Sequence, residues 1–405
     1  MKQKNRIFEI IGVLSVSLIL TSTHSISGAL PLFQEQFPGV SRSALEFMIS
    51  IPTILMTIMI ALSPVFNRLL SERAIITGGL LTIGVSGCLP FFLSSFPAIM
   101  ATRVFLGIGI GLLNAAAVSM VGQRFSGKLR ARLQGMRMSA ETLGQTVLTL
   151  LAGFLLMFGW NYPFLVYVAA FLILILYLSF VPRRETAENA RKQEPVSEGA
   201  AAGKKAARTT GRSQEKTSAL FYALFAALLI SSEVALSLRL PGRIVDSGLG
   251  SAVTGSTILS ISIFGGFLGG ISFGKLISVL GNRMLPVFLG TAAAGMAVIA
   301  LAPNLIILTL GSILCKFSIT SCISYTFNSL SDHVPVEALS TANAIVLVGC
   351  NLGSSVAPFL LNLIDRISAH YSAPFLTYAA VLLCLGAGVA FLIRKRAASP
   401  AGSSR

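Results

Sequence analysis

The sequence predicts an all-helical membrane protein made of two similar halves, each with six transmembrane helices. Three observations support this fold class. The 405 residues are 54% hydrophobic and only 11% charged, far more apolar than a soluble protein of this size. The apolar residues fall into twelve segments of about twenty residues, the length that a helix needs to cross a bilayer core of ~30 Å. Short sequences from the first half also recur in the second half at a nearly constant spacing.

Six apolar segments form the predicted N-terminal bundle, residues 1–181. The first segment follows a basic N-terminus, but no small-residue cleavage site and soluble domain come after it. We therefore interpret it as a membrane helix and not as a signal peptide. The expected helices are residues 7–29, 45–66, 74–93, 97–123, 136–158 and 163–181.

A polar segment, residues 182–218, separates the two halves. It contains nine Lys or Arg residues, five Asp or Glu residues and scattered Gly, Ala and Ser, without an apolar run that could build a core. This composition is typical of a solvated chain. The sequence therefore predicts a disordered cytoplasmic linker over these residues.

Six further apolar segments form the predicted C-terminal bundle, residues 219–393, before a short cytoplasmic tail, residues 394–405. The expected helices are residues 219–240, 252–274, 284–302, 304–329, 340–364 and 373–393. Three short sequences are shared with the first half: Leu30-Pro31 with Leu240-Pro241 at the ends of the first and seventh helices, residues 143–147 with 352–356, and residues 163–167 with 374–378. Together they indicate a duplicated six-helix unit.

The basic residues indicate an orientation in the membrane. The net charge is +16, yet the Lys and Arg residues cluster between apolar segments and not on one amphipathic face, which argues against a nucleic-acid partner. With a cytoplasmic N-terminus, 25 of the 31 basic residues lie on the cytoplasmic side. The outer side has only Arg42, Arg239, Arg243 and Arg366. This bias predicts a multi-pass protein of the cytoplasmic membrane with both termini in the cytoplasm.

No catalytic or cofactor motif is found in the sequence. The five cysteines lie inside apolar segments without the spacing of a metal site, and no phosphate loop, GxSxG motif or nucleotide-binding domain is present. We therefore expect no enzyme activity, no catalytic residue, no cofactor and no metal, and we exclude a pump driven by ATP bound to this chain. The expected partners are a small solute, a coupling ion, for which the proton is favoured, and membrane lipid; the chain is expected to be a monomer.

Three charged residues inside the predicted helices need an explanation, because a charge at the centre of a membrane helix costs at least ~2.5 to 3.5 kcal/mol. Arg103 lies about 9 Å below the outer surface, Glu233 about 12 Å, and Lys316 about 20 Å, near the midplane. The repeat spacing pairs Lys316 with residues 105–110, close to Arg103, and pairs Glu233 with Thr23, next to His24. We expect each half to present one cation to a central cavity.

Two motifs resemble elements of the major facilitator superfamily of secondary transporters. Residues 274–283 are similar to its signature loop, and residues 63–73 form a degenerate counterpart in which Asn67 takes the acidic position. Residues 103–111 are similar to the family's arginine-then-glycine element, which is linked to proton coupling. The resemblance implies the superfamily's fold and alternating access, with gating loops at Asn67, Arg68, Gly274, Lys275, Gly281 and Arg283. Ser278 replaces the acidic residue in the second loop, so neither loop has the acidic residue of the family's cytoplasmic latch, and Glu72 in the first loop is the candidate substitute.

In that family the first, fourth, seventh and tenth helices line the cavity, and His24, Arg103, Glu233 and Lys316 fall one on each. We expect Lys316 and Arg103, with Asn114 and Tyr325, to bind an anionic group of a small organic solute. Glu233 or His24 is expected to exchange the coupling proton, as an intramembrane carboxylate or imidazole can.

Several alternatives remain open from the sequence. Arg103 is equally explained as a residue that ties helices together, His24 as an inert histidine near the outer end, and the uncharged residues as interhelical hydrogen-bonding groups. On the same fold, proton-driven efflux of amphiphilic drugs would use Glu233 to recognise a positive charge. A membrane sensor or lipid-handling protein without solute flux is the alternative of another class.

Overall fold

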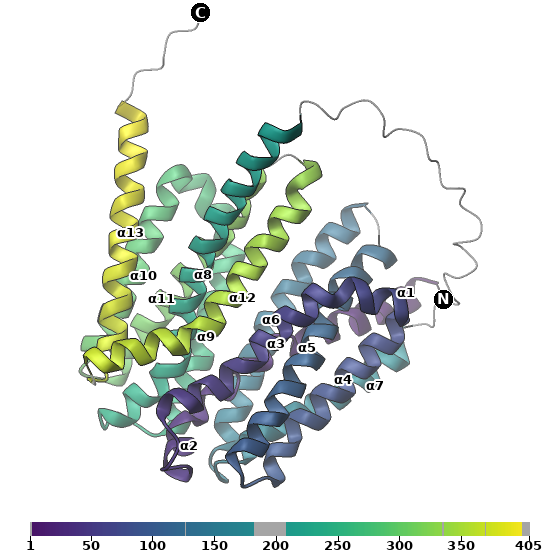
Figure 1. Cartoon of the computed structure of the whole chain (residues 1–405), viewed down its shortest axis with the longest axis horizontal. Helices are drawn as coiled ribbons and strands as arrows, with labels where there is room; N and C mark the ends of the chain where they lie inside the picture. The colour runs from purple at the N-terminus through teal and green to yellow at the C-terminus, as the bar shows by residue number, and fades with distance from the viewer. Residues whose placement is uncertain (1, 126, 182–207, 334–335, 369, 399–405) are drawn as a thin grey trace, which may run out of the picture.

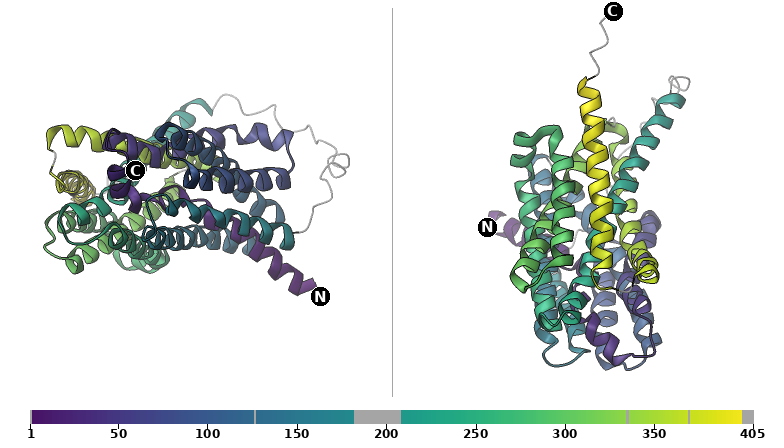
Figure 2. Two further views of the ribbon diagram at one scale, coloured as in Figure 1. Left: turned by 90° about the horizontal axis from the view of Figure 1, so that it is seen from below. Right: turned by 90° about the vertical axis from the view of Figure 1, so that its left-hand side faces the viewer.

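The computed structural model describes residues 2–125, 127–181, 208–333, 336–368 and 370–398, and these residues contain helices and turns but no strand. Two helical bundles lie side by side, the first coloured purple to blue and the second teal to yellow (Figures 1 and 2). Each of the twelve expected helices is present. The fold class is therefore confirmed, with corrections at the ends of some helices.

In the first bundle, the helices after the first one match the expected segments, except that the helix expected over residues 136–158 already begins at Gly127 and ends at Leu155. They are α3 Arg42–Leu69, α4 Glu72–Cys88 with the short 3-10 helix η4 Leu89–Phe92, α5 Phe96–Arg124, α6 Gly127–Leu155, and η5 Tyr162–Val168 leading into α7 Ala169–Phe180. Ser41 and Ser71 cap α3 and α4, because each side-chain oxygen accepts a hydrogen bond from the backbone three residues on.

The first helix is broken, so the continuous helix expected over residues 7–29 is wrong. The chain forms α1 Lys2–Ser15, the 3-10 segments η1 Val16–Ile19, η2 Ser22–His24 and η3 Ser27–Ala29, and α2 Leu30–Gln36, with a bend of 43° between its two parts. Hydroxyl side chains bond to the backbone near the break: Ser15 Oγ donates to Gly12 O at 2.9 Å and Ser27 Oγ to His24 O at 2.6 Å. An equivalent bond from Thr102 to Ile99 O lies inside the continuous helix α5, so these bonds accompany the break without explaining it. Leu30-Pro31 begins α2 and does not end a helix.

The second bundle consists of α8 Arg208–Asp246, α9 Ala252–Leu280 with η6 Gly281–Arg283, α10 Met284–Leu301, α11 Leu305–His333, α12 Val336–Ile367 and α13 Ala373–Ala398. The start of α8 corrects the predicted linker, since residues 208–218 are helical, while residues 182–207 lie outside the described ranges. Elongating an existing helix needs only one further hydrogen bond per residue. Pro241 lies inside α8 and not at its end.

Many of these helices are long and apolar enough to cross a membrane. In the described ranges nine helical stretches meet this condition, or ten with the bent first pair, and α9 and α10 count as a single stretch of 50 residues. Large apolar side chains on the outer surface, such as Leu172, Ile175 and Phe391, are more than half exposed. Such a surface is suited to lipid and not to water.

Close helix contacts recur at equivalent places in the two halves. A Cβ atom on Gly144 of α6 would lie 1.9 Å from Leu18 O, and one on Gly353 of α12 would lie 2.1 Å from Ala227 O. Only glycine permits this approach. The repeated sequences 143–147 and 352–356 therefore have a structural reason, namely the packing of α6 against η1 and of α12 against α8.

The same contacts correct the register of the repeat. Leu18 and Ala227 are 209 residues apart, and a second pair of contacts has the same spacing on this helix. Tyr167 Oη donates to Ser22 O at 3.1 Å, and Tyr378 Oη lies 2.7 Å from Ser231 Oγ. Glu233 therefore corresponds to His24 itself and not to Thr23.

The two bundles meet mainly at one end. We call the end at which α7 finishes and α8 begins the linker end. Contacts between the bundles gather at the opposite end, where α3 packs on α12 and α6 packs on α9 (Figure 1). For example, Ser256 Oγ donates to Thr149 O at 2.9 Å and Ser260 Oγ donates to Thr146 O at 2.7 Å. The structure is thus closed at the end opposite the linker.

Candidate solute site and the charged contacts between the bundles

Lys316 and Glu233 form a buried ion pair between α11 and α8. Lys316 Nζ lies 2.9 Å from Glu233 Oε1 and donates a second hydrogen bond of 3.1 Å to Ser237 Oγ, one turn further along α8. Lys316 is only 2% exposed, whereas Glu233 is 25% exposed. Removing either partner of a buried pair is unfavourable because an uncompensated charge is left behind. Each residue therefore needs an opposite charge beside it, either from its partner or from a ligand that replaces the partner.

His24 joins this pair from the first bundle. Its Nε2 atom lies 3.1 Å from Ser354 Oγ on α12, which links the two bundles. Ser354 follows Gly353, at which α12 packs closely on α8, so His24 lies beside the helix that carries Glu233. Its Nδ1 atom is buried and has no hydrogen-bond partner. The structure thus brings together three of the four titratable residues singled out in the sequence.

Arg103 lies in a different environment. Its side chain is completely buried, Nη1 donates to Tyr167 Oη at 3.2 Å, and the guanidinium lies 4.6 Å from the ring centre of Phe164 and 5.3 Å from that of Tyr167. Tyr167 in turn bonds to the backbone of η2. These contacts all belong to the first bundle. They agree with the alternative that Arg103 ties helices together, and they do not bring it to Lys316.

Glycine contacts also change the expected partner of Lys316 in the first bundle. Two close approaches are equivalent: a Cβ atom on Gly79 would lie 3.2 Å from Gly109 O, and one on Gly295 would lie 2.8 Å from Gly311 O. Asn114 follows Gly109 by five residues, and Lys316 follows Gly311 by five residues. The counterpart of Lys316 is therefore Asn114 and not residues 105–110.

The two uncharged candidates are placed differently. Asn114 is half-buried, and its Nδ2 atom lies 3.9 Å from Met56 Sδ on α3. Tyr325 follows Lys316 by nine residues on the continuous helix α11, which is two and a half turns. Tyr325 therefore lies on the opposite face of α11, where it packs against the apolar core.

The second signature loop forms a defined turn at the linker end. Gly281 ends α9 with φ of +50°, a conformation that favours glycine. Leu70 ends α3 with φ of −122°, so the first loop has no such requirement. Lys275 and Arg283 are exposed, as is Gly274. The side chains of Asn67 and Arg68 lie outside what the structure describes.

A charged network at the closed end was not predicted from the sequence. Arg239 of α8 donates to both carboxylate oxygens of Asp365 on α12, at 2.9 and 2.7 Å. The Nε atom of Arg239 lies 2.7 Å from Oε1 of Glu46 on α3. Arg42 lies 3.4 Å from Glu46 and 3.8 Å from Asp246. We call these five residues the closed-end network. It joins α3 of the first bundle to α8 and α12 of the second.

One signal in the sequence could have revealed this network. Glu46 lies inside the expected helix 45–66 and is completely buried, so its position marks it as an intramembrane charge like Arg103 and Lys316. An end of the seventh helix at residue 240 places Arg239 at the outer surface, whereas α8 continues to Asp246. Asp365 lies one residue beyond the expected helix 340–364.

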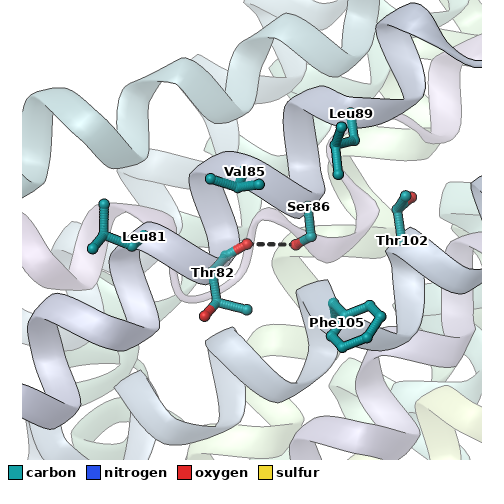
Figure 3. A pocket seen from close by; sticks show the side chains of 7 residues that line it. All are labelled: Leu81, Thr82, Val85, Ser86, Leu89, Thr102 and Phe105. Carbon is teal, nitrogen blue, oxygen red and sulfur yellow. Dashed lines mark hydrogen bonds between the residues drawn. The ribbon is translucent and has the colours of Figure 1, made fainter.

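A surface groove of about 440 Å³ lies between α4 and α5, away from these residues (Figure 3). Its walls are mostly apolar, from Leu81, Val85, Leu89 and Phe105. The hydroxyl of Ser86 is already used, because it donates to Thr82 O at 2.6 Å. The groove therefore lacks the polar groups that would fix a small solute.

Comparisons with known proteins agree with this architecture. A family model described as the Major Facilitator Superfamily matches residues 12–358. No curated protein sequence matches the chain. Among solved structures, a mutant of the peptide transporter POT in complex with sulfate is 14% identical with a TM-score of 0.73, covering 95% of this chain and 94% of that one. A D-xylose-proton symporter is 16% identical with a TM-score of 0.73, covering 94% and 96%.

At such low identities the solved structures establish the fold alone, whereas the family model covers most of the sequence and spans both bundles. The fold, the duplicated bundles and the family model lead to one conclusion: this protein belongs to the major facilitator superfamily of membrane transporters.

Proposed function

We propose that the protein is a secondary active transporter that moves a small organic anion together with a proton across the cytoplasmic membrane by alternating access. The observation that carries this proposal is the ion pair of Lys316 and Glu233, a nearly inaccessible cation whose carboxylate partner is a quarter exposed. The proton-coupled symporter among the similar structures is consistent with it.

The pair provides a way to couple the two substrates. When Glu233 takes up a proton, Lys316 loses its counter-charge and can bind the carboxylate of a solute. When the solute leaves, Glu233 releases its proton and pairs with Lys316 again. Neither substrate is favoured alone, because each would leave one uncompensated charge in a low-dielectric site.

The orientation follows from the basic residues. With both termini in the cytoplasm, the closed-end network would face the outside, and the conformation described here would be the one that is closed outwards. Asn67 and Ser278 stand where the family has acidic residues. The cytoplasmic side would therefore lack the family's charge latch at these positions.

A thermal-shift screen of the purified protein tests the proposal. Small carboxylates, amphiphilic cations, sugars and amino acids are compared on the wild type, on Lys316→Ala, and on Lys275→Ala as an exposed control. We expect carboxylates to raise the melting temperature of the wild type and of Lys275→Ala only, since a selective ligand stabilises the folded state. Uptake of the stabilising carboxylate into proteoliposomes, driven by a pH gradient, then tests transport. Binding without uptake would favour a sensor.

Efflux of amphiphilic cations is a second candidate function. Glu233 is more exposed than Lys316, so an approaching cation would meet this carboxylate first. In that case lipophilic cations would stabilise the wild type and Lys316→Ala, but not Glu233→Gln. Such a result would replace the anion proposal.

A further inference from the structure

We infer that His24 and Asn114 form the second wall of the solute site and select a monocarboxylate that carries an uncharged hydroxyl group at its other end. This inference rests on the proposed function, and it names the class of solute. It starts from the correspondence between the two bundles, which places these two residues at the positions that Glu233 and Lys316 occupy in the other half.

The first correspondence is between His24 and Glu233. Gly144 packs against the backbone oxygen of Leu18, and Gly353 packs against that of Ala227. His24 lies six residues after Leu18, and Glu233 lies six residues after Ala227. Each also lies two residues after the position bonded by a tyrosine, Ser22 or Ser231. The second correspondence, between Asn114 and Lys316, follows from the glycine contacts of α5 and α11 described above.

The two walls have the same placement but different chemistry. The second bundle presents an ion pair, and the first presents an imidazole and an amide. The partners of both residues are uncharged, since His24 Nε2 meets the hydroxyl of Ser354 and the amide of Asn114 meets the sulfur of Met56. The first wall therefore offers hydrogen bonds without charge.

Both residues of the first wall have unused hydrogen-bonding capacity. His24 Nδ1 is buried without a partner. The amide of Asn114 contacts the sulfur of Met56 at 3.9 Å, and a thioether is a weak acceptor. A buried polar atom without a partner is unfavourable. A ligand that forms hydrogen bonds with His24 and Asn114 therefore binds more tightly.

A hydroxyl group fits these two residues well. The contact of His24 Nε2 with Ser354 Oγ can form with either tautomer, so Nδ1 can be an acceptor or a donor. A hydroxyl group can match both cases, and it can bond to either end of an amide. A second carboxylate would instead face neutral groups. Arg103 donates one hydrogen bond to Tyr167 and lies over Phe164, while its buried Nε and Nη2 atoms have no partner. Its contacts stay within the first bundle and do not reach His24 or Asn114.

The experiment compares carboxylates of equal length. The probes are 4-hydroxybutyrate, butyrate and succinate, and the six-carbon series 6-hydroxyhexanoate, hexanoate and adipate. Dissociation constants are measured by calorimetry on the full chain in detergent. We expect the wild type to bind the hydroxy acid of one series about tenfold more tightly than the unsubstituted acid, and to bind the dicarboxylate weakly.

Four variants separate the roles of the residues. Asn114→Leu and His24→Leu should each reduce the preference for the hydroxyl about five- to tenfold, as expected for one lost hydrogen bond. Asn282→Leu, on the exposed turn at the linker end, should leave it unchanged. Asn114→Lys places a cation at the counterpart of Lys316 and should raise the affinity for the dicarboxylate, a gain that an unfolded variant cannot show.

The outcomes distinguish this inference from the function on which it rests. Suppose that Lys316→Ala abolishes carboxylate binding, that Asn114→Leu and His24→Leu leave the affinity ratio of the hydroxy acid to the unsubstituted acid unchanged, and that Asn114→Lys leaves the affinity for the dicarboxylate unchanged. The second wall is then wrong and the anion site stands. If no carboxylate binds the wild type, both are wrong.

Discussion

Lys316 is the residue on which the solute site most depends, because it is almost completely buried and its charge is balanced by a more exposed partner. The sequence predicts its depth and its importance, since a lysine inside an apolar segment is rarely without a role. The sequence cannot predict that Glu233 is its partner. The pair joins residues 83 positions apart, and only the packing of α8 against α11 brings them together.

The difference in exposure predicts unequal effects of removing the two partners. Glu233→Ala leaves a buried ammonium group and should lower the free energy of unfolding by about 3 to 5 kcal/mol. Lys316→Ala leaves a carboxylate that water can reach, so its loss should be smaller. Thermal unfolding in detergent measures both, and the double variant should lose less than the sum of the two single changes. Equal and additive losses would show that the pair is not coupled.

Arg103 should stabilise the first bundle without binding solute. Arg103→Lys removes the planar group that lies against Phe164 and Tyr167, and a desolvated cation–π contact is worth about 2 kcal/mol. We therefore expect a lower melting temperature, while the shift caused by carboxylates is kept. Loss of that shift in a folded Arg103→Lys variant would restore the expectation that both cations bind the solute.

At the scale of helices, α6 and α12 pack so closely on their neighbours that a side chain at Gly144 or Gly353 would clash with the backbone. Gly144→Ala and Gly353→Ala should each destabilise the protein by about 1 to 3 kcal/mol, because the new methyl group would meet a backbone oxygen that cannot move freely. Gly290→Ala in α10 is the matched control, since nothing lies within 4 Å of its Cβ position. Melting temperatures of the three variants check this expectation, which fails if all three behave alike.

The repeated sequences predict these contacts only in part. Residues 143–147 and 352–356 indicate the duplication, but their register needs structure, because the spacing between the halves differs between helices. It is 209 for His24 and Glu233, and 202 for Asn114 and Lys316. The break in the first helix is also hidden in the sequence. Its serines are common in membrane helices as packing residues, so the sequence does not distinguish the 3-10 segments over residues 16–29 from a continuous helix.

At the scale of the whole molecule, the bundles meet along two contacts, α6 with α9 and α3 with α12. We call these contacts seams, and they differ in chemistry. Between α6 and α9, serine hydroxyls donate to backbone oxygens. Between α3 and α12, the rings of Phe47 and Phe359 meet edge to face, Asn362 donates to Ser43, and the closed-end network adds buried charge. The seam of α6 and α9 can slide or tilt without separating charges. The closed-end network must instead be hydrated when its end opens.

Weakening the closed-end network should therefore shift the protein towards the state that is open at this end. Arg239→Gln leaves Glu46 and Asp365 without their shared cation, and Glu46 gains most from contact with water because it is completely buried. Spin labels introduced by Ser43→Cys and Asn362→Cys, in a background without the native cysteines, measure the distance between α3 and α12 at this end. We expect one short distance in the otherwise unaltered protein and a second, longer one with Arg239→Gln.

The matched control for this measurement is Glu35→Gln, which removes an exposed charge on α2 that belongs neither to the gating loops nor to the closed-end network. It should leave the short distance unchanged. The size of the shift depends on how strongly the network favours closure: a variant that changes the free-energy difference by about 1.4 kcal/mol changes the ratio of the two states about tenfold. An unchanged distance distribution in Arg239→Gln would mean that the uncharged contacts of the two seams hold this end closed by themselves.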